Sequence, residues 1–281
     1  MAPLRVSRKS FVESYAERTK ALSKMVAKLP DRPSPDVIHD LRVVTRRVQM
    51  IRRVVPRKFR GSEDSKDFDF ALRSILTETS QLRDMDTLVE TLKSHRRSVP
   101  VELLINLENQ RSDAAARAKE ATGLLKVISV PSLDASELRG RRLSRRLSKR
   151  VREHSKEALS LLTVVLDDES KVEDLHSLRK EVKKMRYLIE LADKAPARLS
   201  ALAKWQERLG DIRDLDVAIA HLEEARGDSK PGAILELRRV RHSSYLKFVR
   251  DCRAGGTLAL GEMRSPPMNG LGSNNLSSAE A

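Results

Sequence analysis

Apolar residues recur every three or four positions along most of the chain, which is the spacing of one face of an α-helix. Proline, glycine and serine interrupt this pattern at intervals, and most prolines stand at the interruptions, where they disturb a helix least. The pattern predicts an all-α fold with helices at roughly 4–29, 36–55, 66–97, 101–122, 136–166, 171–192, 197–225 and 231–252.

Two details concern breaks in this pattern. We expect the third helix of each half to be interrupted near its middle, in the second half at Gly210-Asp211. From Gly255 onward the chain reads as a polar linker rich in Gly, Ser and Asn, which predicts a disordered tail over 255–281.

A histidine motif occurs once in each half of the chain. His39 is followed by leucine at +2, arginine at +3 and a basic pair at +7 and +8, and His176 repeats this spacing. The two copies place the following basic residues after their histidines: Arg42, Arg46 and Arg47 in the first, and Arg179, Lys183 and Lys184 in the second.

Two further features recur in the same order around the histidine motif. The segment Leu82-Arg-Asp-Met-Asp matches Ile212-Arg-Asp-Leu-Asp, and a basic pair lies 31 and 30 residues before each histidine, at Arg8-Lys9 and at Arg145-Arg146. Such recurrence predicts an internal duplication. We expect one domain over 1–254, with repeat one at about 4–122, a linker at about 123–135 and repeat two at about 136–253.

The charge balance indicates the kind of partner and says little about the fold. Lys+Arg number 55 against 40 Asp+Glu, a net charge of +15, which favours nucleic acid, an anionic membrane face or a soluble polyanion as partner. The basic residues of the motif helices share one helix face, opposite apolar residues such as Leu41 and Leu178. The helix after Arg139 carries a further basic stripe at Arg142, Arg145, Arg146 and Lys149.

Two interpretations of these basic faces stay open. Charge runs are commonly solvated helix faces, but here they consist mainly of arginine and are little mixed with acid. Arginine suits phosphate because its planar fork makes paired charge-assisted hydrogen bonds. The two motif histidines are either phosphate donors or structural residues, and the arginine at +3 argues against a metal ligand role.

The second motif offers four carboxylates, at Asp84, Asp86, Asp214 and Asp216. We expect them to cap helices or to orient neighbouring arginines, with metal binding or catalysis as the weaker alternative. The chain has no Gly-rich phosphate loop and no nucleophile motif, so we expect no catalytic residue, no metal site and no cofactor.

With these motifs the chain resembles the CHAD family, named for conserved histidines and an α-helical domain. The resemblance covers about residues 4–253. It implies two four-helix bundles related by a pseudo-twofold axis, with basic residues lining a central pore or groove. It also implies binding of inorganic polyphosphate and association with polyphosphate granules. Many relatives carry a fused CYTH triphosphatase domain, for which this chain has no strand-rich segment, so it resembles a stand-alone member.

The expected function is therefore binding of inorganic polyphosphate by a non-enzymatic module. Nucleic acid is the alternative partner, disfavoured because the basic helices are nearly bare of the aromatic residues on which bases stack. A metal-dependent phosphohydrolase is the less favoured third hypothesis. We expect polyphosphate contacts from Arg5, Arg8, Lys9, His39, Arg42, Arg46, Arg47, Arg142, Arg145, Arg146, Lys149, His176, Arg179, Lys183, Lys184 and Arg186.

The composition indicates the cellular compartment of the protein. The single cysteine, Cys252, excludes an internal disulfide, and the first residues lack the apolar core of a secretory signal. The apolar runs are too short to span a bilayer, so we expect no membrane partner and a cytoplasmic protein. The sequence leaves the oligomeric state open, a homodimer included.

Overall fold

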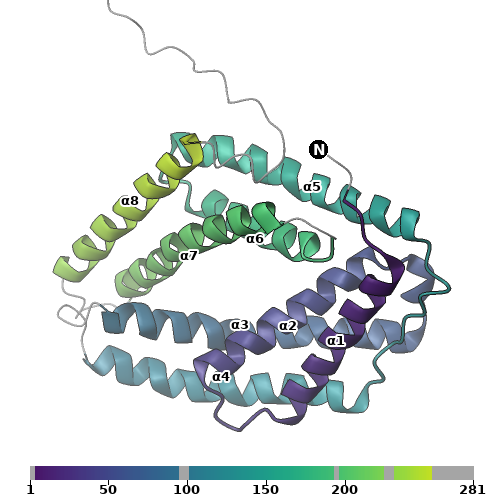
Figure 1. Cartoon of the computed structure of the whole chain (residues 1–281). Helices are drawn as coiled ribbons and strands as arrows, with labels where there is room; N and C mark the ends of the chain where they lie inside the picture. Colours follow the sequence, from purple (N-terminus) through teal and green to yellow (C-terminus); the bar gives the residue numbers. More distant parts are fainter. Residues whose placement is uncertain (1–3, 95–100, 193–195, 225–230, 255–281) are drawn as a thin grey trace, which may run out of the picture.

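The computed structural model describes residues 4–94, 101–192, 196–224 and 231–254 (Figure 1). Within these ranges it contains eight α-helices, one short 3-10 helix and no strand, which confirms the all-α prediction. The helices are α1 (Arg8–Ala27), α2 (Pro35–Val54), α3 (Glu63–Ser94), α4 (Val101–Val127), α5 (Gly140–Asp167), α6 (Val172–Ile189), α7 (Pro196–Glu224) and α8 (Pro231–Arg253), and the 3-10 helix η1 (Arg57–Phe59) follows α2.

Local chemistry explains where the first two helices begin. Ser7 and Ser34 stand in extended conformation before α1 and α2, and their side chains accept hydrogen bonds from the main-chain N–H groups of Ser10 and Val37. Pro35 then opens α2, a position where its missing N–H leaves no hydrogen bond unmade. The predicted tail at 255–281 lies outside the described residues.

The expected breaks in the third helix of each half are wrong. α3 and α7 each run without interruption, and Gly210 lies inside α7. A Cβ atom at Gly210 would lie 3.8 Å from Nε of Arg179, an ordinary contact distance, so the glycine faces α6. Because Asp84 and Asp214 stand well inside α3 and α7, neither caps a helix, which corrects the capping hypothesis.

The helices pack in the same order in both halves of the chain. α1 contacts α2, α2 contacts α3 and α3 contacts α4, while α5, α6, α7 and α8 contact one another in the same succession. The halves meet where α2 contacts α6 and α3 contacts α7 (Figure 1). The helices that carry the recurring motifs, α2 and α3 with α6 and α7, therefore face one another.

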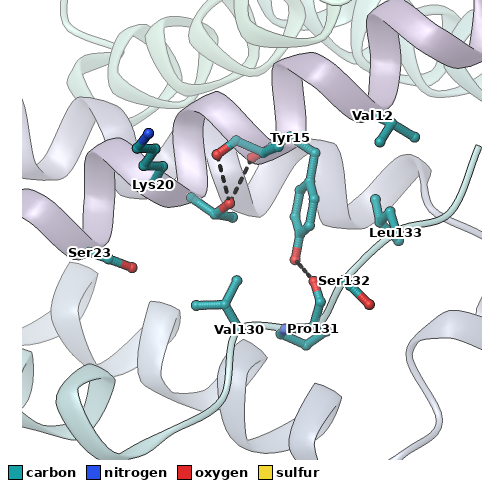
Figure 2. Close-up of a pocket in the computed structure, with 10 residues that line it drawn as sticks. Val12, Tyr15, Lys20, Ser23, Val130, Pro131, Ser132 and Leu133 are labelled. Atoms are coloured by element: carbon teal, nitrogen blue, oxygen red, sulfur yellow. Dashed lines mark hydrogen bonds between the residues drawn. The ribbon is translucent and has the colours of Figure 1, made fainter.

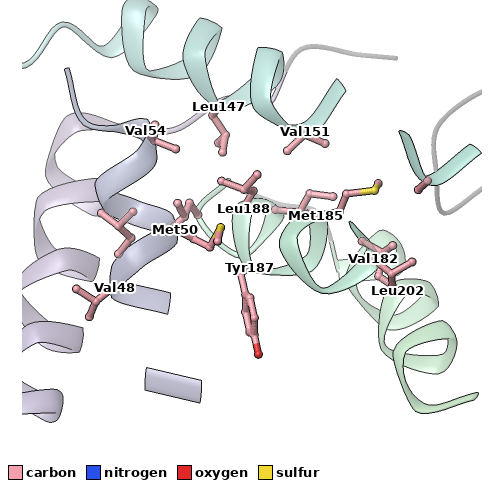
Figure 3. Close-up of a cluster of buried hydrophobic side chains, with 14 of the residues drawn as sticks. Val48, Met50, Val54, Leu147, Val151, Val182, Met185, Tyr187, Leu188 and Leu202 are labelled. Carbon is pink, nitrogen blue, oxygen red and sulfur yellow. The ribbon is translucent and has the colours of Figure 1, made fainter. Parts of the chain in front are cut away.

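The hydrophobic core crosses from one half to the other. Val54 of α2, Leu147 and Val151 of α5, and Leu188 of α6 belong to one buried cluster (Figure 3). Tyr187 extends from α6 away from the cluster's other labelled side chains. Burying aliphatic side chains is the main favourable term in folding, and a core shared in this way holds α2 and α6 at a fixed separation.

The α4–α5 linker is tied to α1 by a buried tyrosine. Oη of Tyr15 donates a hydrogen bond of 2.8 Å to the carbonyl of Pro131 (Figure 2). A shallow cavity of about 360 Å³ lies beside this contact, lined by Val12, Lys20 and Leu133 among others. The bond joins the linker to the first helix of the chain.

A matched ion pair stabilises each half. Arg111 of α4 donates from Nε to Asp86 of α3 at 2.5 Å, and Arg241 of α8 donates from Nε to Asp216 of α7 at 2.8 Å. The two pairs have the same separation of 25 residues. Each arginine also donates to a main-chain carbonyl ahead of a motif helix, that of Pro33 before α2 or Glu169 before α6. Asp86 and Asp216 thus hold the outer helices and the entry of the motif helices, instead of orienting motif arginines.

None of the described helices combines the length and the apolar character needed to cross a membrane.

Candidate functional site

A cavity of about 810 Å³ lies between α2, α3, α6 and α7. Eight arginines, three lysines and two histidines line it, against three aspartates. They are Arg42, Arg46, Arg47, Arg53, Arg83, Arg179, Arg186, Arg213, Lys180, Lys183, Lys184, His39, His176, Asp40, Asp84 and Asp214. With the histidines neutral, cations outnumber anions by eight, so this cavity holds about half of the chain's net charge of +15.

Both halves of the chain contribute to this cavity at matching positions. His39 and His176 line it together, as do Arg42 and Arg179. Four more matched pairs follow: Arg46 with Lys183, Arg47 with Lys184, Arg83 with Arg213, and Asp84 with Asp214. The duplicated motifs therefore converge on one cavity instead of forming two separate faces.

Arg42 is held by α3 at the wall of the cavity. Its Nη1 donates to the carbonyl of Leu76 and to Oγ1 of Thr79, both at 2.7 Å, and its side chain is almost fully buried. The helix pattern places Arg42 on the basic face but does not predict this burial. Burial and neighbouring cations lower the pKa of Arg42 to about 10, so the guanidinium stays charged at neutral pH.

Arg179 occupies the matching position with fewer partners. Leu209 stands on α7 where α3 has Thr79, so the hydroxyl acceptor is missing in the second half. Within the described part of the chain, the buried Nε of Arg179 has no hydrogen-bond partner. The same holds for Nδ1 of His176, one turn earlier on α6. Buried polar nitrogens that are left unpaired are costly, so these two atoms are candidates for contact with a ligand.

The cavity disfavours additional positive charge. Burial first, and then Arg213 and the other cations nearby, lower the pKa of His176 to about 4. Burial and the neighbouring Arg179 and Arg46 lower the pKa of Lys183 to about 7. The pKa of His39 is also lowered, by burial and by Arg83. A bound anion would favour the charged forms of these groups and so raise their pKa values again.

Two glutamates at the edge of the cavity hold some of its cations. Glu190, at the end of α6, accepts two hydrogen bonds from Arg47, at 2.9 Å and 3.3 Å, and lies 3.5 Å from Nε of Arg186. Glu181, which is buried, accepts from Lys184 and contacts Nδ1 of His154 at 2.6 Å. These acids fix the direction of Arg47, Arg186 and Lys184, so a ligand meets side chains that are already positioned.

Seven residues proposed from the sequence lie away from this cavity, on α1, α5 and the segment that precedes α1. Main-chain N–H groups of Leu4 and Val6 donate to Ser148 and Ser144, which lays this segment along α5. We call this region the outer basic surface; its predicted members are Arg5, Arg8, Lys9, Arg142, Arg145, Arg146 and Lys149. Several bind within the protein: Arg8 donates to the carbonyl of Leu138, and Arg146 to that of Val55.

The sequence analysis missed four basic residues of the cavity: Arg53, Arg83, Lys180 and Arg213. Arg83 and Arg213 belong to the second recurring motif, so their recurrence could have identified them. The sequence analysis assigned roles to the aspartates of that motif and not to its arginines. Arg53 lies two helical turns beyond Arg46 on α2, and a longer projection of the same face would include it.

The carboxylates of the cavity do not form a metal site. In the ranges that the structure describes, no group of three His, Cys, Asp or Glu side chains could hold a metal ion. The carboxylates of Asp84 and Asp214 lie near the guanidiniums of Arg42 and Arg179 instead, and their charges favour the ionised arginines. No hydrogen bond joins either aspartate to these arginines within the described residues, so the orienting role stays a prediction.

Comparisons with known proteins agree with this architecture. A family model described as CHAD domain matches residues 16–223. The crystal structure of the CHAD domain from the plant Ricinus communis is similar, with a TM-score of 0.56, 17% sequence identity and 95% of each chain covered. At this identity the likeness concerns the fold. No curated protein matches the chain.

Proposed function

Because this chain belongs to the CHAD family, we propose that the cavity between α2, α3, α6 and α7 binds inorganic polyphosphate. The observation that carries the proposal is the excess of eight positive charges around one cavity of about 810 Å³. Like charges this close repel one another, and a polyanion would remove that repulsion.

Polyphosphate fits the distribution of these charges. Each internal phosphate of the chain bears about one negative charge at neutral pH, so basic residues along its path can each meet one. The matched pairs lie on helices of both halves, so cations can contact a linear anion from two sides. Neutral His176 and the unpaired Nε of Arg179 add donors at the same wall. We infer that two four-helix bundles, related by duplication, share this single site.

Nucleic acid fits the cavity less well. Recognition of single strands commonly uses aromatic rings on which bases stack. Among the residues that line the cavity, Tyr187 is the one aromatic side chain, and it is 5% exposed. The outer basic surface could contact duplex nucleic acid through the phosphate backbone, but its cations are spread over α5, the start of α1 and the segment before α1.

The proposal is one of binding without catalysis, in the cytoplasm, with polyphosphate granules as a site of association. The cavity arginines are accompanied by few carboxylates, and a phosphohydrolase would need several to hold Mg²⁺. The free, buried Cys252 suits a reducing compartment.

A salt titration tests the proposal. Affinity for long-chain polyphosphate should fall with salt along a log–log slope steeper than about −3, because each neutralised phosphate releases counterions. Orthophosphate should bind far more weakly, since one small anion meets few of the cations. Fluorescence anisotropy with end-labelled polyphosphate at several salt concentrations gives the slope.

RNA of equal total charge is the matched control. Polyphosphate should displace it at a lower concentration of charge, because the cavity holds little aromatic surface for bases. A slope near −1, or RNA that resists displacement, would contradict the proposed function.

A further inference from the structure

Lys183 is an unusual member of the cavity. Arg179 lies one turn earlier on α6, Arg42 and Arg46 face it from α2, and Asp214 faces it from α7. Within the described residues Lys183 makes no hydrogen bond or ion pair, and the charge of Asp214 is the one influence that favours its ammonium form. Its neighbours therefore include three guanidiniums and one carboxylate, and His39 and His176 also lie within reach of its charge.

Neighbouring lysines on the same helix differ in this respect. Lys184, the next residue, donates a hydrogen bond to Glu181. Lys180 is exposed at the edge of the cavity. Repeat one has Arg46 at the position that matches Lys183, so the second half alone presents an amine there. An amine surrounded by guanidiniums is suited to reagents that carry a phosphate.

We propose that Lys183 is an acylation site, modified by small acyl phosphates whose phosphoryl group is bound by Arg42, Arg46 and Arg179. The neutral amine attacks the acyl carbon, and a C–N bond forms while the C–O bond to phosphate breaks. Phosphate leaves with the electron pair and takes up the proton released from nitrogen. The products are an amide of Lys183 and hydrogen phosphate, so charge and atoms balance without a further reactant.

The electrostatics of the cavity favour both the attack by the amine and the departure of the phosphate. Burial and the three arginines lower the pKa of Lys183 to about 7, so a large share of the amine is neutral near neutral pH, unlike an ordinary lysine. The same arginines stabilise the leaving phosphate, whose charge grows as the C–O bond breaks. Asp214, nearby on α7, is a carboxylate that can relay the proton.

Acylation would alter the binding site. An amide at Lys183 can no longer carry a positive charge, and it adds an acyl group to the lining of the cavity. Weaker polyphosphate binding after acylation is the regulatory consequence, and this consequence, unlike the reaction itself, rests on the proposed function.

The test treats the full chain with acetyl phosphate and follows acetylation of each lysine by peptide mass spectrometry over time. Lys183 should react at least about tenfold faster than Lys184, because the neutral amine is the nucleophile. Pyrophosphate, which competes for the arginines, should slow Lys183 and leave Lys184 unchanged. Equal rates at the two lysines, or no protection by pyrophosphate, would overturn the proposal.

A second reagent shows whether the reaction of Lys183 depends on binding of the phosphoryl group or only on the nucleophilicity of its amine. 4-Nitrophenyl acetate transfers the same acetyl group without a phosphate. The ratio of Lys183 to Lys184 modification should be several-fold higher with acetyl phosphate than with the ester. An equal ratio would refute binding of the phosphoryl group by the arginines. Neither result depends on polyphosphate, so failure here is distinguishable from failure of the proposed function.

Discussion

Replacing Arg46, Arg83 and Arg213 together with glutamine should weaken binding of long-chain polyphosphate on the order of a thousandfold, because each charge-assisted hydrogen bond contributes about 1.5 kcal/mol or more. These three arginines line the cavity from α2, α3 and α7, and within the described ranges none of them is in a hydrogen bond or ion pair with the protein. They are therefore free to contact a ligand, and their removal leaves no buried partner unpaired.

The outer basic surface provides the matched control. Replacing Arg142, Arg145 and Lys149 with glutamine removes the same three charges from the exposed face of α5. Affinity should stay within about fivefold of the unaltered protein, because exposed charges outside the site act only through screened long-range attraction. Titration by anisotropy at one fixed salt concentration compares the variants. Equal losses in the two triple variants would mean that net charge, and not the cavity, determines binding.

Lys183→Met should have opposite effects on stability and binding. At pH 6 it should stabilise the protein without ligand by about 2 kcal/mol, because it removes an ammonium buried among arginines. Water in the cavity screens part of this repulsion, so the gain is smaller than full burial would give. Polyphosphate affinity should fall several-fold, since one cation of the site is lost.

The stabilisation should depend on pH in a defined direction. The pKa of Lys183 is about 7 in the folded protein, below that of a free lysine, so the unfolded chain binds more protons between these values. The destabilisation by Lys183 is therefore complete below about pH 7 and shrinks as pH rises. The other groups that face it are common to both proteins: Arg42, Arg46, Arg179, Asp214, His39 and His176.

Urea unfolding of both proteins at pH 6 and pH 9 measures this difference. The advantage of Lys183→Met should fall to less than about half at pH 9. Lys184→Met is the comparison variant, and it should destabilise at both pH values because it leaves the buried Glu181 without its lysine partner. An advantage that stays constant with pH would show that Lys183 is not perturbed in the folded state.

Much of the fold followed from sequence periodicity. The start of α2 at Pro35 was predicted to within one residue, because a serine and a proline mark it locally. The first helix was predicted from residue 4 but begins at Arg8, after the Ser7 cap. The matched motifs also predicted which helices carry the basic residues, since spacing on a helix fixes which side chains share a face.

The features that the sequence did not predict depend on contacts between segments far apart in the chain. Arg42 looks like any other face residue in the sequence, but Leu76 and Thr79 of α3 hold it in the structure. The interruption expected at Gly210 was wrong because α7 packs against α3, α6 and α8, and this tertiary packing outweighs the low helix propensity of glycine. The basic stripe of α5 has the same local pattern as the motif helices, and only the three-dimensional arrangement separates it from the cavity.

The central claim is that the two halves form one binding site, and calorimetry with a polyphosphate of defined length near ten phosphates tests it most directly. The account predicts one polyphosphate per protein, and the same stoichiometry with lower affinity when Arg46 and Arg83, or Lys183 and Arg213, are replaced by glutamine or methionine. Two polyphosphates per protein, reduced to one of unchanged affinity by either double replacement, would contradict a shared cavity.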